Sequence, residues 1–289
     1  MIDKNEFDTV ITAKPRFFDL HLKETFRYKD LCLLFVKRDF KAGYKQTILG
    51  PVWAIIQPLL TTVMFFFVFG KLARLDTSDI TGNFVVPRFL FYFGSSICWS
   101  YFASTLQATS NTFLQNRAVM GKVYYPRFVS PLSTAVSHLI SFFIQFALLA
   151  AAYIYYLSRD LGDMKITPYL LLFPLCIIQL MMLSLGLGII ISSVTTKYRD
   201  LAMLVSFGLQ ILHYLCPVAY GLSIVPEKYM RIYMLNPVTP ILTTFRFSLF
   251  GGGYFNMFYF VVSLAVTLVI FFAGLFLFGR VERTFMDTI

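Results

Sequence analysis

The sequence predicts an all-α integral membrane protein with six transmembrane helices, and three observations support this fold class. Of the 289 residues, 57% are hydrophobic and only 14% are charged, whereas a soluble domain carries about 25% charged residues. Six uncharged stretches are long enough for the roughly 20 helical residues that cross a bilayer. They are continuously apolar, unlike the short alternating segments of a membrane β-barrel. The predicted spans are 52–70, 89–113, 131–157, 168–194, 201–216 and 256–279.

The distribution of basic residues predicts the orientation of these spans. Segments 1–51, 114–130, 195–200 and 280–289 hold 17 of the 25 Lys and Arg residues. Cytoplasmic loops carry an excess of Lys and Arg, so we expect these segments inside, with a cytoplasmic N-terminus over 1–30 and a cytoplasmic tail over 280–289. The first 30 residues mix acidic and basic side chains without an apolar core, so no signal peptide is expected there.

Residues 31–49 predict a basic amphipathic helix that lies in the membrane interface. At about 100° per residue, one narrow arc holds the apolar side chains Leu33, Val36, Phe40 and Tyr44. The adjoining flank holds the cations Lys37, Arg38, Lys41 and Lys45. Each cation at this depth attracts anionic membrane lipid by about 1 kcal/mol. The helix either simply anchors the chain, or also docks a partner subunit and captures a phosphorylated lipid.

The first span is expected to begin and bend at prolines. Gly50 and Pro51 suit the end of one helix and the start of the next, since proline is tolerated in a first helical turn. Trp53 follows at the interfacial depth where tryptophan is enriched. Pro58 lies inside the span, where proline kinks a helix.

Two loops are expected on the cytoplasmic side. Residues 114–127 form a short basic loop without acidic residues, carrying Arg117, Lys122 and Arg127. These cations either only enforce the topology, or the loop presses against a soluble partner. Residues 195–200 form a second, very short loop, so the fourth and fifth spans should be antiparallel neighbours.

Residues 217–246 interrupt the pattern of spans. The uncharged run 232–245 is too short to cross a bilayer, and it contains Pro237 and Pro240. An apolar run of this length is typical of a re-entrant or interfacial helix. We expect paired short helices that dip back from the outer face; the alternative is an ordinary apolar outer loop.

The remaining polar and aromatic residues have both a functional and a purely structural interpretation. Aromatic residues reach 18% of the chain; some can stack on sugar rings, but most are expected to face lipid or pack between helices. His138 and His213 lie in apolar spans, either as functional groups or as neutral, hydrogen-bonded core histidines. The four cysteines stand singly and are expected to be small buried hydrophobes.

Several motifs are absent from the sequence. It contains no GxxxxGK[ST] loop, so the chain is not itself a P-loop ATPase. No predicted span contains a carboxylate, which argues against proton coupling through a membrane Asp or Glu. No His/Cys/Asp cluster or nucleophile elbow occurs, so we expect neither an enzyme nor a metal or other cofactor in this chain.

One segment resembles a known family. Residues 37–58 read KRDFKAGYKQTILGPVWAIIQP, which resembles the amino-terminal signature of polysaccharide-export ABC permeases. That family includes O-antigen, capsule and teichoic-acid exporters, and the O-antigen branch fits best. The resemblance extends over the whole chain through the amphipathic N-terminus, the six spans, the basic loop after the second span and Asn236-Pro237 before the last span.

The resemblance implies a transport subunit of the bacterial cytoplasmic (inner) membrane. Two copies of it would assemble with two copies of a separate ABC ATPase, which binds ATP and Mg²⁺, and no nucleic-acid partner is expected. Its substrate would be an undecaprenyl-pyrophosphate-linked polysaccharide that enters from the cytoplasmic leaflet. The interface helix carries over onto 31–49, the coupling loop onto 114–127 and the outer gate helices onto 217–246. The channel would be lined mainly by the first and fifth spans.

Candidate site residues follow from these assignments. The cations expected to receive the lipid pyrophosphate are Arg38, Lys41 and Lys45. The residues expected to contact the ATPase are Asn116, Arg117, Lys122 and Tyr124. The channel candidates are Trp53, Phe207, His213, Tyr214 and Tyr220.

Other functions are compatible with the same sequence. A capsule or teichoic-acid exporter shares the predicted architecture, and so does a small-molecule efflux permease. A membrane-embedded lipid-sugar transferase is the alternative from another class, and the missing acidic catalytic pair counts against it.

Overall fold

The chain folds into a bundle of helices. A computed structural model describes residues 27–45, 47–72, 85–112, 115–116, 125–195 and 200–284, and the regular secondary structure of these residues is entirely helical. The prediction of an all-α protein is therefore confirmed for this part of the chain. The main helices are α2 (Lys29–Tyr44), α3 (Trp53–Phe65), α5 (Arg88–Ser110), α7 (Val129–Ser158), α8 (Leu172–Thr195), α9 (Leu201–Leu215), α10 (Glu227–Leu235), α11 (Val238–Phe250) and α12 (Met257–Thr284).

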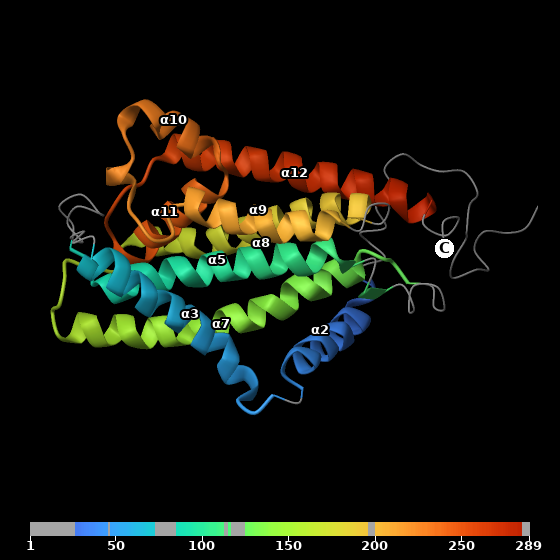
Figure 1. The fold of residues 1–289 in the computed structure, drawn as a ribbon, viewed down its shortest axis with the longest axis horizontal. Coiled ribbons are helices and arrows are strands. Elements are labelled where there is room, and N and C mark those ends of the chain that lie inside the picture. Colours follow the sequence, from blue (N-terminus) through green and yellow to red (C-terminus); the bar gives the residue numbers. More distant parts are fainter. Residues whose placement is uncertain are drawn as a thin grey trace, which may run out of the picture.

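Six of these helices run lengthwise between the two ends of the bundle (Figure 1). They are α3, α5, α7, α8, α9 and α12, and each runs opposite to the one before it in the chain. Helix α2 lies along the outside of α7, close to the end where α12 finishes. Helices α10 and α11 lie at the opposite end. The bundle thus has one end built around α2 and another built around α10 and α11.

Among the described residues, four helical stretches are long and apolar enough to cross a membrane: Gly50–Phe69, Val129–Ser158, Pro168–Thr195 and Met257–Gly279. The predicted second span corresponds to α5, whose 23 residues suffice in length at about 1.5 Å per residue. It is less apolar because most of its side chains, serines and threonines included, are buried against other helices rather than exposed to lipid. The predicted fifth span corresponds to α9, which has only 15 residues.

Helix α8 lies at the centre of the bundle, between α5 and α12. A methyl group added at Gly186 would lie 2.8 Å from the Cα atom of Phe271, and one added at Gly274 would lie 2.7 Å from the carbonyl oxygen of Gly186. On the other side of α8, a methyl group at Gly188 would lie 2.6 Å from the Cβ atom of Thr109. Small residues therefore allow α8 to approach both neighbours closely, as is common in membrane helix pairs.

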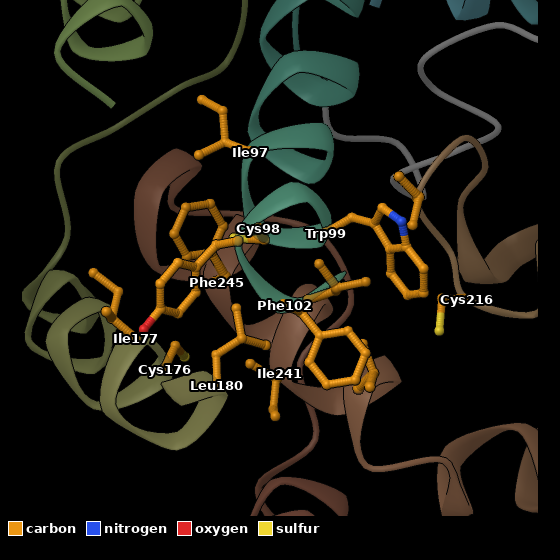
Figure 2. Packing of buried hydrophobic residues seen from close by; sticks show 14 of the residues in the cluster. Ile97, Cys98, Trp99, Phe102, Cys176, Ile177, Leu180, Cys216, Ile241 and Phe245 are labelled. Atoms are coloured by element: carbon orange, nitrogen blue, oxygen red, sulfur yellow. The ribbon is translucent and has the colours of Figure 1, made fainter. Parts of the chain in front are cut away.

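Large apolar side chains fill the space between α5, α8 and α11. Figure 2 shows Phe102 of α5, Leu180 of α8 and Phe245 of α11 packed together; none of the three is more than 2% exposed. Three of the four cysteines are also buried, as predicted, whereas Cys32 on α2 is only partly buried. Burial raises the pKa of the Cys32 thiol above its ordinary value, so this side chain stays neutral.

Two glutamines join neighbouring helices. The Nε2 atom of Gln179 on α8 donates to the hydroxyl of Ser263 on α12, 2.9 Å away. The Nε2 atom of Gln145 on α7 donates to the carbonyl oxygen of Ala54 on α3, 2.8 Å away. Such interhelical bonds add stability in a bilayer, where water does not compete for the donors.

The interface helix is shorter than the predicted 31–49. It ends at Tyr44, and Lys45 already has an extended backbone (φ −63°, ψ 133°). Gly50, at φ +52°, takes the left-handed conformation that favours glycine, and a short 3₁₀ turn (Gly50–Val52) leads into α3. Pro58 lies inside α3 as predicted, and the helix continues as a π-helix (Phe66–Leu72).

Residues 217–246 contain two short helices, α10 and α11, preceded by a 3₁₀ turn (Leu222–Ile224). The uncharged run 232–245 is not one helix, because α10 ends at Leu235 and α11 begins after Pro237. Helix α11 is buried along most of its length against α8 and α5, whereas α10 is mostly exposed. Gly251 ends α11 in the left-handed conformation (φ +78°).

The close approach of α8 and α12 makes Gly186 sensitive to substitution. We expect Gly186→Ala to lower the midpoint of thermal unfolding in detergent, because its methyl group would force two helix backbones apart, at a cost of about 1–3 kcal/mol. Gly208→Ala on α9 is the matched control, since nothing lies within 4 Å of the added methyl group. It should keep or slightly raise the midpoint. Equal midpoints for the two variants would contradict the assigned helix contact.

Candidate functional site

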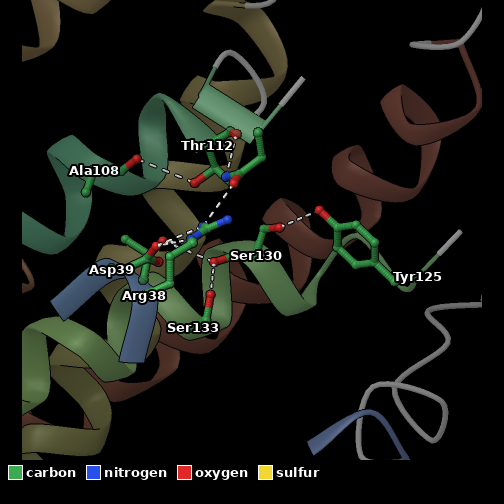
Figure 3. Close-up of polar contacts among 9 residues, drawn as sticks. Arg38, Asp39, Ala108, Thr112, Tyr125, Ser130 and Ser133 are labelled. Carbon is green, nitrogen blue, oxygen red and sulfur yellow. Dashed lines mark hydrogen bonds and ion pairs between the residues drawn. The ribbon is translucent and has the colours of Figure 1, made fainter. Parts of the chain in front are cut away.

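The α2 end of the bundle brings together a predicted substrate residue and a predicted coupling residue. The Nη2 atom of Arg38, on α2, donates to Oδ1 of Asn116, 3.1 Å away. Its Nε atom donates to Oδ1 of the neighbouring Asp39 at 2.8 Å (Figure 3). The contact joins α2 to the segment that follows α5, although 78 residues separate the two partners in the chain.

Both ends of the Asn116 side-chain amide are engaged. Its Nδ2 atom donates to the carbonyl oxygen of Thr112 at 3.1 Å, while its Oδ1 atom accepts the bond from Arg38. Only 7% of this residue is exposed. Because an arginine can only donate, the cation fixes which side of the amide faces α2.

An aromatic chain links the same arginine to the other end of the predicted coupling loop. The guanidinium carbon of Arg38 lies 4.5 Å from the ring centre of Phe35, within cation–π distance. Phe35 meets the ring of Tyr125 edge-on at 5.5 Å, and the Tyr125 hydroxyl lies 3.0 Å from that of Ser130 at the start of α7. Burial raises the pKa of the Tyr125 phenol, so it remains a neutral hydrogen-bonding group. Helix α2 thus contacts both ends of segment 114–127.

Helix α2 packs one face on the bundle and leaves another free. Val36 is buried, and the hydroxyl of Tyr44 lies 3.1 Å from that of Ser141 on α7. Leu33 and Leu34, by contrast, are 55% and 61% exposed. The predicted apolar arc is therefore divided between the bundle and the surroundings, and the exposed leucines suit contact with lipid.

The three cations predicted to receive the substrate differ in their surroundings. Lys41 and Lys45 are exposed, and Lys45 lies just beyond the end of α2. The Arg38 side chain is 44% exposed, and its Nη1 atom has no hydrogen-bond partner among the residues described. Arg38 is therefore oriented by Asp39, Asn116 and Phe35 while donors remain for an incoming phosphate oxygen.

Three of the predicted coupling residues, Arg117, Lys122 and Tyr124, lie outside the described residues. The part of the chain that the structure describes contains no group of three His, Cys, Asp or Glu side chains arranged to hold a metal ion. The described site at this end consists of cations, amides and aromatic rings.

The channel candidates do not form one cluster. Trp53, at the start of α3, is 48% exposed, and Phe207 in the middle of α9 is 60% exposed. His213 and Tyr214 lie at the far end of α9, next to Tyr220. The hydroxyl of Tyr220 donates to the carbonyl oxygen of Tyr214 at 2.8 Å and also bonds to the hydroxyl of Tyr233.

His213 lies in an aromatic environment. Its ring stacks on Phe65 of α3 at 5.8 Å and meets Trp99 of α5 at 5.0 Å. Among the residues that the structure describes, its buried Nδ1 atom has no hydrogen-bond partner. The imidazole therefore joins α9 to α3 and α5 by ring packing, without the hydrogen bond at Nδ1 that a hydrogen-bonded core histidine would make.

Helices α3 and α9 expose much of their apolar surface. None of the residues of α9 is buried, and only Pro58 and Thr62 are buried on α3. The large side chains exposed on the two helices are Trp53, Leu60, Val63, Met64, Met203, Leu204, Phe207, Ile211, Tyr214 and Leu215. These helices therefore present apolar and aromatic surface to lipid, to another protein or to a substrate.

Sequence reasoning missed Arg246 on α11. It closes the predicted gate segment 217–246, in which the sequence pattern assigns it no role, yet it is only 7% exposed. A signal was present in the sequence: between residues 232 and 279, Arg246 is the single charged side chain. An ionisable residue in such a setting is a functional candidate by default.

Comparisons with known proteins point to one family. The family profile described as ABC-2 type transporter matches residues 30–250. The chain is 26% identical to an O-antigen export system permease protein RfbA of Klebsiella pneumoniae over 259 residues, which cover 89% of this chain and 94% of the relative. It is 25% identical to the protein of the same name from Myxococcus xanthus over 228 residues, covering 78% and 82%.

The bond between Arg38 and Asn116 predicts energetic coupling between the two side chains. The single changes Arg38→Ala and Asn116→Ala should each lower the midpoint of thermal unfolding in detergent. The decrease in the double variant should be smaller than the sum of the two single decreases. The expected coupling is below about 1 kcal/mol, since Arg38 is partly exposed. Lys37→Ala is the control. Lys37 is an exposed neighbour of Arg38, so the decreases in midpoint caused by Lys37→Ala and Asn116→Ala should simply add. Additive losses for the Arg38 pair would contradict the contact.

Proposed function

Because the chain belongs to the ABC-2 type transporter family, we propose that it is the permease subunit of an ATP-driven exporter of an undecaprenyl-pyrophosphate-linked polysaccharide, of the O-antigen type, across the bacterial inner membrane. The observation that carries this proposal is the similarity to O-antigen export permeases along 89% of the chain. The matched region, residues 30–250, includes all of the cationic helix α2 except its first residue, Lys29. The cations of α2 suit an anionic lipid headgroup.

The proposed topology places both termini in the cytoplasm with six spans. The alternating direction of α3, α5, α7, α8, α9 and α12 supports an even number of crossings. In this arrangement α5 crosses inside the bundle, and α9 crosses together with the residues that flank its 15-residue helix. Helices α10 and α11 then serve as the gate helices at the outer face.

A separate ABC ATPase is the proposed energy source. ATP hydrolysis acts on the membrane subunit through cytoplasmic segments, and residues 114–127 form the proposed contact. The bond between Arg38 and Asn116 and the ring contact between Phe35 and Tyr125 support this assignment. Force applied to the loop would reach α2, and through it the start of α3.

The proposed substrate entry site is the exposed side of α2. A lipid pyrophosphate carries concentrated negative charge at the cytoplasmic headgroup level, where Arg38, Lys41 and Lys45 would lie. Arginine donates to phosphate oxygens from a planar group of fixed direction, whereas lysine acts as a point charge. With Nε and Nη2 of Arg38 bonded to Asp39 and Asn116, Nη1 is, among the described contacts, the nitrogen left to donate to the phosphate. Asp39 and Asn116 pre-orient the guanidinium, which lowers the entropic cost of binding.

The proposed export path runs between two copies of the chain. Helices α3 and α9 expose the apolar surface required either for pairing with a second copy or for contact with a glycan. Aromatic rings such as Phe207 and Tyr214 offer faces on which sugar rings stack, and tyrosine adds a hydroxyl. A homodimer would place two such surfaces opposite each other.

This proposal is tested by co-purifying the permease with its ABC ATPase and measuring ATP hydrolysis in proteoliposomes. We expect the lipid-linked glycan to stimulate hydrolysis above the lipid-only level. Arg38→Lys should reduce this stimulation about tenfold, the factor expected for loss of a charge-assisted hydrogen bond, while basal hydrolysis persists. A purely electrostatic anchor would tolerate this change, because the charge is retained.

A control variant and a second class of substrate distinguish this proposal from the alternative functions. Lys37→Arg is the matched control. It exchanges the same two cationic side chains at the neighbouring position and should leave the stimulation by glycolipid unchanged. Stimulation by small hydrophobic drugs but not by the lipid-linked glycan would identify a small-molecule efflux permease instead. Equal stimulation of wild type and Arg38→Lys would place glycolipid recognition elsewhere.

A further inference from the structure

Arg246 on α11 is buried at the opposite end of the bundle from α2. Its side chain contacts two other segments of the chain, the turn after α9 and helix α5. The Nη1 atom donates to the carbonyl oxygen of Pro217 at 2.9 Å and to the hydroxyl of Ser95 on α5 at 3.3 Å. The guanidinium carbon lies 4.4 Å from the ring centre of Phe91, also on α5. No carboxylate pairs with Arg246 in the described part of the chain, so carbonyl, hydroxyl and ring contacts surround this cation.

Pro217 supplies a carbonyl that requires an external donor. Helix α9 ends at Leu215, and Cys216 continues in an extended conformation (ψ 148°). Pro217 therefore lies beyond the last turn of α9, where its carbonyl has no place in the helical hydrogen-bond ladder, and the residue is buried. A buried carbonyl without a hydrogen-bond donor is strongly unfavourable in an apolar environment. The bond from Arg246 removes that cost and fixes where the chain turns away from α9.

The same turn is tied to α10. The hydroxyl of Tyr220 bonds to that of Tyr233 on α10 and to the carbonyl oxygen of Tyr214 at the end of α9. Asn236, just after α10, donates from Nδ2 to the Sγ atom of Cys216 at 3.2 Å. Polar side chains therefore link the turn after α9 to α10. Among the hydrogen bonds named here, those of Arg246 are the ones that link the same turn to α11 and α5.

A small cavity lies against the guanidinium. It has a volume of about 20 Å³ and is lined by Phe91, Thr243, Arg246, Phe247, Gly253 and Tyr254, among others. A site needs roughly 10–15 Å³ to hold one water molecule, so this cavity has room for a water beside the cation. A hydrated guanidinium can exchange its bond to Pro217 for a bond to water, whereas a dry one cannot do so without a large penalty.

We propose that Arg246 is a positioning residue for export: through the carbonyl of Pro217 it holds the end of α9 against α5 and α11. This inference rests on the proposed function, in which α9 lines the export path and α10 and α11 form the outer gate. Movement of α9 during export then displaces α11 as well, because one cation binds both. The adjacent water site allows the link to be released and restored.

The test uses the full-length permease in complex with its ATPase and compares Arg246→Lys, Arg246→Met and the control Ser95→Ala. The first readout is hydrogen–deuterium exchange of the backbone amides of residues 212–221. Arg246→Met should speed exchange there about tenfold, the factor expected for loss of a charge-assisted hydrogen bond. Arg246→Lys should show a smaller increase, because lysine keeps one donor, and Ser95→Ala should match wild type.

The second readout is ATP hydrolysis with and without lipid-linked glycan. We expect Arg246→Met to lose the stimulation at least tenfold while basal hydrolysis persists, and Arg246→Lys to retain part of it. A residue that only stabilises the fold would lower both rates together. If Arg246→Met does not assemble, the difference between Arg246→Lys and Ser95→Ala decides the question.

The two readouts separate this inference from the proposed function. Faster local exchange in a complex that no glycolipid stimulates would support the role of Arg246 in positioning α9 and refute the glycan as substrate. Unchanged exchange at 212–221 in both Arg246 variants would overturn the inference, and so would an equal effect of Ser95→Ala.

Discussion

The close contact of α8 with α12 and α5 is the constraint on which the rest of the structure depends. Lipid tails are as apolar as the helix surfaces, so burial of apolar area does not drive helices together in a bilayer. Close packing does, and the glycines at 186, 188 and 274 allow backbone-to-backbone approach. Once α8 is held on both sides, α11 can bury its apolar face against α8 and α5.

Helix α5 connects the two polar sites of the molecule. At one end, Ser95 and Phe91 receive Arg246 from α11; beyond the other end, Asn116 receives Arg38 from α2. The 23 residues of α5 span roughly 35 Å at 1.5 Å per residue. Most residues of α5 are buried, and the helix packs against α8 and α7. In the proposed exporter it would therefore serve as the fixed frame against which α2 and α11 shift.

The sequence predicted those features that depend on local pattern and missed those that depend on distant contacts. Long apolar runs predicted the helices, and Pro51 was expected at the start of a helix, where the structure has the 3₁₀ turn that leads into α3. The bond from Arg38 to Asn116 links positions 78 residues apart, which no periodicity reveals. The role of Arg246 was missed for the same reason. Its partners, Ser95 and Pro217, come from segments that only tertiary packing brings together.

The proposed export of a lipid-linked glycan is tested by measuring the movement of the glycan across a bilayer. The permease and its ATPase would be reconstituted into sealed proteoliposomes, with the glycolipid added only to the face that carries the ATPase. Accessibility of the glycan to an endoglycosidase enclosed in the lumen would then be followed over time. For an ATP-driven exporter we expect cleavage that requires ATP and that stops in a complex whose ATPase binds but does not hydrolyse ATP. Cleavage at the same rate without ATP, or no cleavage with ATP, would show that this chain does not export the glycan in this way.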